Sequence, residues 1–312
     1  GRLTLTALED WGGSMASNVR SYVGGNLALD LEGTKCGFLK GIEGGAVTAD
    51  VITEAVGADY FVRKHIGGPK YEDITLEIGF SMAKPIFSWI ADSWEMKLQR
   101  KKGSIIACDY KLQAQTQRDF FDAMIVETVI PALDGASKEA GYIKVKLSPE
   151  TIRTAKASGK IEGGTKQKIF VASNFSLDIP GLDCKRVSKI DSFTVKQSVA
   201  AERVGELRDM EKEPGRIEFP NLKITFSETS AQSWRDWFED FVVKGNSGED
   251  KEKNGTLTFL SSNRQEKLAS INLFNLGVFR LVDATPGGAD AIHRVSAELY
   301  CERMQFVPGG GA

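Results

Sequence analysis

A segment of eleven residues occurs twice in this chain, and this repetition constrains the fold more than any other feature. NLALDLEGTKC, residues 26–36, and NFSLDIPGLDC, residues 174–184, agree in five columns at a fixed spacing of 148 residues. Unrelated residues of ordinary composition agree in about one column in fifteen. The sequence therefore predicts two related halves. The shared columns are Asn26/Asn174, Leu29/Leu177, Asp30/Asp178, Gly33/Gly181 and Cys36/Cys184.

The same spacing continues through a strand and a helix in each half. Residues 74–78, ITLEI, correspond to residues 222–226, LKITF, and the period-two alternation of apolar residues is typical of a half-buried strand. Apolar residues at helical spacing then predict one helix that begins near Pro85 and another for which Ser230 is the candidate N-cap. The predicted core anchors on these helices are Trp89, Trp94, Trp234 and Trp237.

Each half is also predicted to hold a long loop between its second and third strands, at residues 53–70 and 200–216. Loops of this length are uncommon in compact domains and are usually functional or disordered. The second one alternates charges of both signs, which leaves a solvated flap and an inter-subunit contact as alternatives. The residues predicted for inter-subunit contact are Tyr60, Arg63, His65, Glu202, Arg203, Arg208 and Glu211.

The repeat sets the domain boundaries. Residues 1–25 have no partner in the second half and are predicted to be an N-terminal arm, either a contact with a neighbour or a frayed terminus. The first domain is predicted at residues 26–150 and the second at residues 169–308. Residues 151–168 are polar and contain several glycines, so they are predicted to be the linker.

Composition and motifs indicate no chemical activity. The chain has 40 basic and 42 acidic residues, so it has no overall basic field that would gather nucleic acid. It has neither a secretory signal nor an apolar run long enough for a membrane span, and synthesis in the cytoplasm without a membrane partner is expected. His65 and His293 are the only histidines, and the four cysteines are far apart. We therefore predict no catalytic residue, no metal, no cofactor and no enzyme, with reduced cysteines.

With these elements in order, each half resembles the tail-tube protein family of contractile phages and extracellular contractile injection systems. The resemblance rests on an opening hairpin (NLALDLEGTKCGFLKGI, NFSLDIPGLDCKRVSKI), a long loop, a strand (PKYEDITLEIGF, RIEFPNLKITFS) and a tryptophan-containing helix (IFSWIADSW, WRDWFEDF). The glycine-rich loop of the family is matched in the first half, whereas the second half departs from it. The residues that match are Tyr60, Arg63, Gly67, Gly68 and Pro69.

The resemblance implies a mainly β fold with one helix per repeat (α+β), arranged as two tandem tail-tube-like β-sandwich or barrel domains. It also implies a structural subunit of an inner tube, with DNA or a protein effector passing through stacked rings. The implied partners are further copies of the chain, a sheath protein and baseplate or terminator proteins, and the implied destination is a virion tail or injection particle. Three chains in a pseudo-sixfold ring are favoured by closed symmetry.

Other arrangements stay open at the level of sequence. Six chains could form a tube-terminal or baseplate-proximal adaptor ring, with one half outside the tube. The two halves could also be a tandem, non-enzymatic ligand-binding module whose charged loops recognise a ligand. An enzyme with a dispersed active site is a more distant option.

Overall fold

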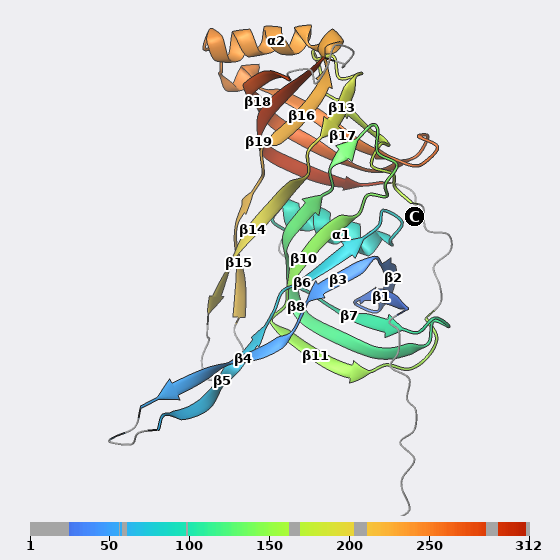
Figure 1. Ribbon diagram of the computed structural model, residues 1–312, viewed down its shortest axis with the longest axis vertical. Helices are drawn as coiled ribbons and strands as arrows, with labels where there is room; N and C mark the ends of the chain where they lie inside the picture. Colours follow the sequence, from blue (N-terminus) through green and yellow to red (C-terminus); the bar gives the residue numbers. More distant parts are fainter. Residues whose placement is uncertain are drawn as a thin grey trace, which may run out of the picture.

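Two stacked β-sheets dominate the protein, with one helix lying between them and another at the far end (Figure 1). The computed structural model describes residues 25–55, 57, 61–97, 99–161, 169–202, 211–284 and 293–309. The prediction of a mainly β fold with one α-helix in each half is confirmed, and the structure contains a nearly closed, barrel-like sheet. That the halves are tandem copies of one domain stays a prediction.

The first half builds a sheet in the order β2-β1-β7-β8-β10-β6-β3, which we call the first sheet. Its strand β6 shows why the alternating pattern folds this way, because Ile74, Leu76 and Ile78 are all fully buried while the residues between them are half-buried. The elements of this half are β1 (Asn26–Leu31), β2 (Thr34–Leu39), β3 (Gly41–Gly44), β4 (Val47–Glu54), β5 (Arg63–Tyr71), β6 (Ile74–Ile78), α1 (Lys84–Trp94), β7 (Lys101–Cys108), β8 (Ala114–Ile130), β9 (Leu133–Asp134), β10 (Ile143–Ser148) and β11 (Thr151–Lys156).

The second half builds a sheet in the order β12-β17-β18-β19-β16-β13-β9, which we call the second sheet. Strand β16 repeats the burial pattern of β6 with Leu222, Ile224 and Phe226 inside. The elements of this half are β12 (Phe175–Asp178), β13 (Val187–Ile190), β14 (Phe193–Glu202), β15 (Glu211–Glu218), β16 (Leu222–Ser227), η1 (Glu228–Ser230), α2 (Gln232–Phe238), η2 (Glu239–Val243), η3 (Glu249–Lys251), β17 (Lys253–Leu260), β18 (Lys267–Ala284) and β19 (Arg294–Pro308).

The two halves share unusual backbone geometry at corresponding positions. Gly33 and Gly181 both have a φ of 84°, a conformation that glycine adopts without steric cost. Asp122, with a φ of 49°, and Asn275, with a φ of 55°, lie beside a bulge in the long strands β8 and β18. Asp and Asn tolerate this left-handed region better than other side chains. The two central strands are therefore bent in the same way at the same point.

The opening hairpin forms in the first half but not in the second. Strands β1 and β2 pair with each other, whereas β12 pairs with β17 and β13 pairs with β16 and β9. Pro180 lies two residues after the end of β12 and has no N–H to donate to a ladder. The chain turns here, with the Leu182 N–H donating to the Ile179 carbonyl oxygen at 3.0 Å, but the next strand is β13. A cavity of about 550 Å³ opens between β12 and residues 182–187 instead.

The two predicted long loops are largely β-hairpins, so their assignment as loops was wrong. Strands β4 and β5 occupy Val47–Glu54 and Arg63–Tyr71, and strands β14 and β15 occupy Phe193–Glu202 and Glu211–Glu218. Charged residues and the Gly-Pro pairs at 68–69 and 214–215 hide the strand pattern in the sequence. Proline is tolerated in such strands because they lie at a sheet edge, where an N–H can be spared.

The predicted linker is also partly wrong, because residues 151–156 form β11, and every residue of β11 pairs with β8. The boundary at residue 150 crosses continuous structure: β14 pairs with β8 of the first half, and β9 pairs with β13 of the second. The core is shared as well. Trp94 of α1 packs edge-on against Phe306 of β19, with ring centroids 5.7 Å apart. The two halves are joined by both sheet and core.

The second helix starts later than the sequence predicts. Ser230 lies inside η1, where it is buried, and α2 follows an N-cap at Ala231 that makes no side-chain cap. The oxygen that caps this region belongs to Ser227, which accepts a hydrogen bond from the backbone of Thr229. The helix then widens into the π-helical turn η2. This widening shifts the apolar stripe, so Val242 is 42% exposed instead of facing the core.

Candidate assembly interface

A strand of the second half completes the first sheet within the same chain, and we call this contact the in-chain joint. Val195 of β14 is 3% exposed and lies opposite Thr128 of β8, which is 1% exposed. Strand β15 then lies on the outer side of β14, so the first sheet gains a complete hairpin (Figure 1). The paired residues are Phe193 with Ile130, Thr194 with Val129, Val195 with Thr128 and Lys196 with Glu127.

Two charged side chains of the first half bind both backbone polar groups of one residue in β15. The backbone N–H of Lys212 donates to Oε1 of Glu150 at 2.9 Å, and its carbonyl oxygen accepts from Nη2 of Arg100 at 2.7 Å. Arg100 also donates to Glu150 at 2.8 Å, which closes the arrangement. The Glu150 side chain is only 14% exposed. Charge-assisted hydrogen bonds of this kind fix the position of the hairpin as well as adding stability.

The side chain of Lys212 enters the first half from the same point. Its Nζ donates to Oγ of Ser148 at 2.9 Å and lies 3.8 Å from Oδ1 of Asp73. Burial lowers the pKa of this amine, and the nearby carboxylates of Asp73 and Glu150 oppose that shift. The in-chain joint therefore combines ladder hydrogen bonds with a partly buried cation.

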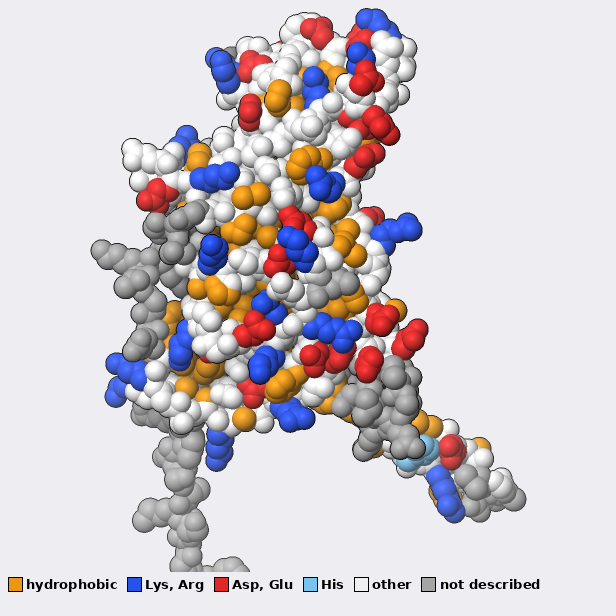
Figure 2. Space-filling model, turned by 180° about the vertical axis from the view of Figure 1, so that it is seen from behind, with side chains coloured by type: hydrophobic (Ala, Val, Ile, Leu, Met, Phe, Trp, Pro, Cys, Tyr) orange, Lys and Arg blue, Asp and Glu red, His pale blue; other side chains and the backbone are white. Residues whose placement is uncertain are grey.

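The first half has a second hairpin, β4–β5, that no other described strand pairs with (Figure 1). Its register matches that of β14–β15: Val51 pairs with Ile66 as Val199 pairs with Pro214, each directly after a bulge. Figure 2 shows hydrophobic side chains along this projecting hairpin. The exposed large apolar residues here are Val47, Val51, Ile52, Phe61, Val62 and Ile66.

The second sheet has an open edge at the matching place. Strand β17 pairs with β18 as far as Leu276, and residues 277–284 of β18 pair only with β19 among the described strands. Two apolar side chains are exposed on this segment, Phe279 at 42% and Val282 at 40%. In the first sheet the corresponding edge of β8 is the one that β14 covers. The chain therefore presents one unpaired hairpin and one uncovered strand edge.

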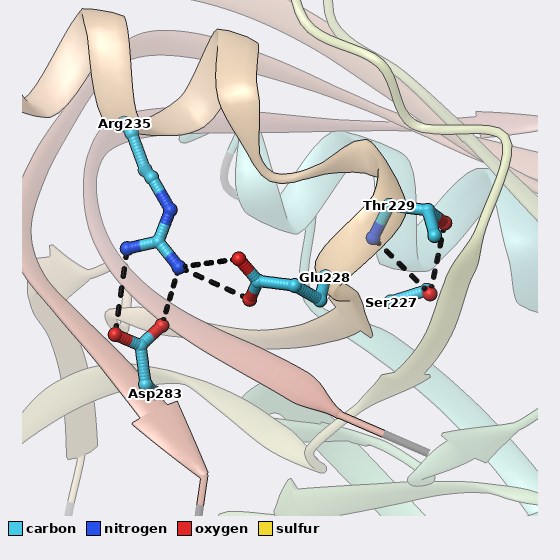
Figure 3. A network of polar contacts seen from close by, with 5 residues as sticks. All are labelled: Ser227, Glu228, Thr229, Arg235 and Asp283. Atoms are coloured by element: carbon cyan, nitrogen blue, oxygen red, sulfur yellow. Dashed lines mark hydrogen bonds and ion pairs between the residues drawn. The ribbon is translucent and has the colours of Figure 1, made fainter.

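An ion-pair network fixes the end of this open edge (Figure 3). Arg235 of α2 donates to Oδ1 of Asp283 at 2.6 Å and to Oε1 of Glu228 at 2.8 Å. These two carboxylates raise the pKa of the guanidinium further above its ordinary value. Asp283 lies on β18, and Glu228 lies in η1 close to the cap formed by Ser227. The network ties the helix region to the end of the strand.

The predicted contact residues lie on the two hairpins where the structure describes them. Arg63 and His65 are exposed on β5, and His65 Nε2 is 3.9 Å from Oε1 of Glu54. Glu202 and Glu211 face each other across β14 and β15. Tyr60, Arg203 and Arg208 lie outside the described residues. The predicted anchors Trp89, Trp94, Trp234 and Trp237 are at most 8% exposed.

Sequence reasoning missed the residues that form the in-chain joint. Arg100 lies in a short run of basic residues after α1, and Glu150 lies where the sequence predicts a linker. Lys212 is one cation in a segment that alternates charges. None of these has a sequence neighbour that marks it as a contact residue. The only available signal was the repeat itself, which places β14–β15 and β4–β5 at equivalent positions.

The described residues contain no group of three or more His, Cys, Asp or Glu side chains placed to hold a metal ion. No helix in the described part of the chain is both long and apolar enough to span a membrane. The four cysteines are free, and burial raises the pKa of the Cys36 and Cys301 thiols to about 11. These thiols are thus held in the protonated form at neutral pH.

Comparison with solved structures gives partial matches. A chain of the PVC sheath–tube complex of an extracellular contractile injection system is 16% identical, with a TM-score of 0.40 over 48% of this chain and 100% of its own. A chain of the sheath/tube terminator of the same kind of system is 17% identical, with a TM-score of 0.37 over 41% and 92%. Hcp1 from Flavobacterium johnsoniae is 12% identical, with a TM-score of 0.26 over 44% and 95%.

The sequence comparison finds a similarity for one segment of the chain. No curated protein sequence matches the chain. Residues 28–153 match the model of the T4-like virus tail tube protein gp19 family. This segment contains β8, which receives the hairpin in the in-chain joint, and β4–β5, which remains free. Residues 28–153 are therefore similar to the T4-like virus tail tube protein gp19 family.

Proposed function

We propose that this chain is the structural subunit of a phage-tail-like inner tube and self-assembles into stacked rings around a central channel. Three chains form one ring, and the two halves of each chain alternate around a wall of six near-equivalent segments. The observation that carries this proposal is the in-chain joint, in which β14 of one half extends the sheet of the other half. An uncovered strand edge is an aggregation hazard, and a closed ring covers every edge.

The proposal treats the halves as tandem copies of one tail-tube-like domain. Three observations support this: the common register of the two hairpins, the bulges in β8 and β18, and the equal φ of Gly33 and Gly181. A chain built in this way forms one joint internally and leaves one hairpin and one edge for its neighbours. A head-to-tail interface of that kind closes into a ring when its rotation returns to the start.

In the assembled particle, each ring contacts further rings above and below it. A sheath protein surrounds the tube, baseplate or terminator proteins contact its ends, and DNA or a protein effector passes through the channel. These partners are proposed from the tail-tube family of residues 28–153. The role is mechanical and non-enzymatic. We propose that the chain is made in the cytoplasm and then enters a virion tail or injection particle.

Electron microscopy of the purified protein at increasing concentration tests this proposal, together with the native mass of the same sample. End-on views with threefold symmetry, a six-lobed wall and a central channel are expected, with the mass of three chains per ring. Six chains per ring would instead support a terminal or adaptor ring with one half outside the tube. A monomer that persists at all concentrations and binds a defined ligand would refute the tube and support a binding module.

A further inference from the structure

The second sheet places different side chains at the positions that form the in-chain joint. Lys101 begins β7 and Lys253 begins β17, and in both strands a bulge follows directly. The residues that precede these lysines, Arg100 and Glu252, are therefore at equivalent positions. Strands β10 and β19 can be matched in the same way through their pairing with β8 and β18. By that register Tyr300 and Glu302 take the places of Ser148 and Glu150.

The result is a pair of carboxylates without a cation. Glu252 accepts a hydrogen bond from the Tyr300 hydroxyl at 2.6 Å and one from Nδ2 of Asn275 at 2.8 Å, which holds its side chain in place. Glu302 is exposed. Neither Glu252 nor Glu302 forms an ion pair with any Lys, Arg or His among the described residues. The position where the first sheet has Arg100 paired with Glu150 therefore holds two carboxylates in the second sheet.

The two hairpins differ in charge in the opposite sense. Their common register aligns three successive residues of β5 with three of β15. The three aligned residues of β15 are a cation between two carboxylates, whereas the three aligned residues of β5 are two permanently charged cations and a histidine. All three β5 residues are exposed. The aligned residues are Arg63 with Glu211, Lys64 with Lys212 and His65 with Glu213.

We infer that the β4–β5 hairpin of one chain binds the open edge of β18 in a second copy of this chain, with its cations against Glu252 and Glu302. This inference rests on the proposed ring and specifies its inter-chain contact. The register follows from the in-chain joint, where Val195 and Lys196 lie opposite Thr128 and Glu127. Transferred to the second sheet, it places Val47 opposite Leu281 and Thr48 opposite Arg280 of the neighbour.

Burial of apolar surface supports the same contact. Val195 is 3% exposed in the in-chain joint, whereas Val47, which has the same position in the free hairpin, is 52% exposed. Phe279 and Val282 on the edge of β18 are also exposed. Adding a strand to an exposed edge gives affinity through main-chain hydrogen bonds, and the side chains give specificity. Both partners of this contact therefore have apolar surface that the contact would bury.

The exchange of charges also makes each hairpin unsuited to the other site. If the β4–β5 hairpin bound the first sheet, Lys64 would take the place of Lys212, and the cation Arg63 would replace Glu211 on the strand that Arg100 contacts. The acidic β14–β15 hairpin would bring Glu211 and Glu213 beside the two carboxylates of the second sheet. Like charges placed together at an interface disfavour the wrong partner. The charges thus direct each hairpin to its own sheet and keep the halves alternating around the ring.

A disulfide test measures the register. Thr48 and Arg280 are both exposed, and directly opposite residues of paired strands lie within the distance that a disulfide spans. The full chain with Thr48→Cys and Arg280→Cys is oxidised with diamide, and the two thiols lose their hydrogens to it. We expect covalent multimers on denaturing gels. The control combines Thr48→Cys with Val282→Cys, which lies two residues away on the same strand, and should give about tenfold less product.

A charge-reversal test measures specificity. Arg63→Glu with Lys64→Glu alters only exposed positions, so folding should be unchanged, and the concentration needed for assembly should rise about tenfold or more at low salt. Adding Glu252→Lys and Glu302→Lys to that variant should restore assembly. Reversal of two exposed lysines outside both joints, Lys138→Glu and Lys185→Glu, is the matched control and should have little effect. Assembly is followed by sedimentation velocity and electron microscopy.

The outcomes separate this inference from the proposed function. If the unaltered chain forms rings and the hairpin reversal leaves their assembly unchanged, the inference is wrong and the ring proposal stands. Failure of the compensating substitutions to restore assembly would overturn the assignment of Glu252 and Glu302 as partners, and equal cross-linking by both cysteine pairs would overturn the register. If the unaltered chain never assembles, the ring proposal itself fails.

Discussion

Two tryptophans on helix α1 offer a matched test of how buried polar groups affect stability. Trp89 is 1% exposed, and its indole N–H donates to the carbonyl oxygen of Gln99 at 2.9 Å. Trp94 is 3% exposed, and its N–H has no hydrogen-bond partner among the described residues. Replacing either one by Phe removes the N–H and keeps an aromatic ring. The two substitutions therefore remove similar apolar surface and differ in the hydrogen bond.

The expected magnitudes follow from these contacts. Each Trp→Phe change loses roughly 1 kcal/mol of apolar burial. Trp89→Phe also loses a hydrogen bond worth about 1 kcal/mol, so its total cost is about 2–3 kcal/mol once some cavity is included. Trp94→Phe instead relieves an unpaired buried donor, which is worth about 1–3 kcal/mol. With the same allowance for a cavity, its net effect should lie between a loss of about 1 kcal/mol and a gain of about 2 kcal/mol.

Urea unfolding measures the free energy of unfolding of both variants, at protein concentrations too low for assembly. Equal m values would show that the unfolded states of the variants are comparable. Trp94→Phe should retain the packing of its ring near Phe219 and Phe306, whose centroids lie 6.3 and 5.7 Å from that of Trp94. The reasoning is refuted if Trp94→Phe lowers the free energy of unfolding as much as Trp89→Phe does. That result would mean that the indole N–H contributes nothing and that ring packing alone decides.

Three further predictions concern buried groups. Trp89→Ala and Trp237→Ala should each lower the free energy of unfolding by about 3–5 kcal/mol, and negligible losses in urea unfolding would contradict their role in the core. Burial and the neighbouring carboxylate of Glu252 raise the pKa of Tyr300 in the folded protein. The resulting stability is therefore complete below about pH 10 and should be lost as the pH rises further. Urea unfolding from pH 8 to 11 should show this loss in the unaltered chain but not in Tyr300→Phe. Cys36 and Cys301 should react with iodoacetamide at pH 8 only after unfolding, and rapid labelling detected by mass spectrometry would contradict their burial.

Strong periodicity made some of the fold predictable. The alternation at residues 74–78 and 222–226 has one physical cause, burial of a single face, and it gave the correct strands. The helix from Lys84 to Trp94 was predictable because Pro85 and its apolar stripe agree. The second helix starts later than predicted because Ser230 lies in the 3-10 turn η1, and the π-helical turn η2 at its other end changes the period, which a repeat of 3.6 residues cannot represent.

The hairpins were not predictable because their stability comes from outside the local sequence. Strand β15 reads as a charged loop, yet Arg100 and Glu150 bind its backbone from distant positions. Strand β11 reads as a linker because its exposed edge is polar, although Ile152 is buried and the whole strand pairs with β8. Such contacts become visible only when the chain is folded. The predicted contact residues were selected by their charge and by the resemblance to the family's glycine-rich loop, and their role stays a prediction.

The in-chain joint also changes what the remaining contacts must do. When two binding elements belong to one chain, their contact forms at a high effective concentration and needs little intrinsic affinity. The joint between chains has no such help, so in the proposed ring it must gain more from its own surfaces. The free hairpin is accordingly the more apolar of the two, with Val51 and Ile66 where β14–β15 has Val199 and Pro214. If such a hairpin bound the first sheet, Arg63 would replace Glu211 on the strand that Arg100 contacts, and the like charges would disfavour that contact.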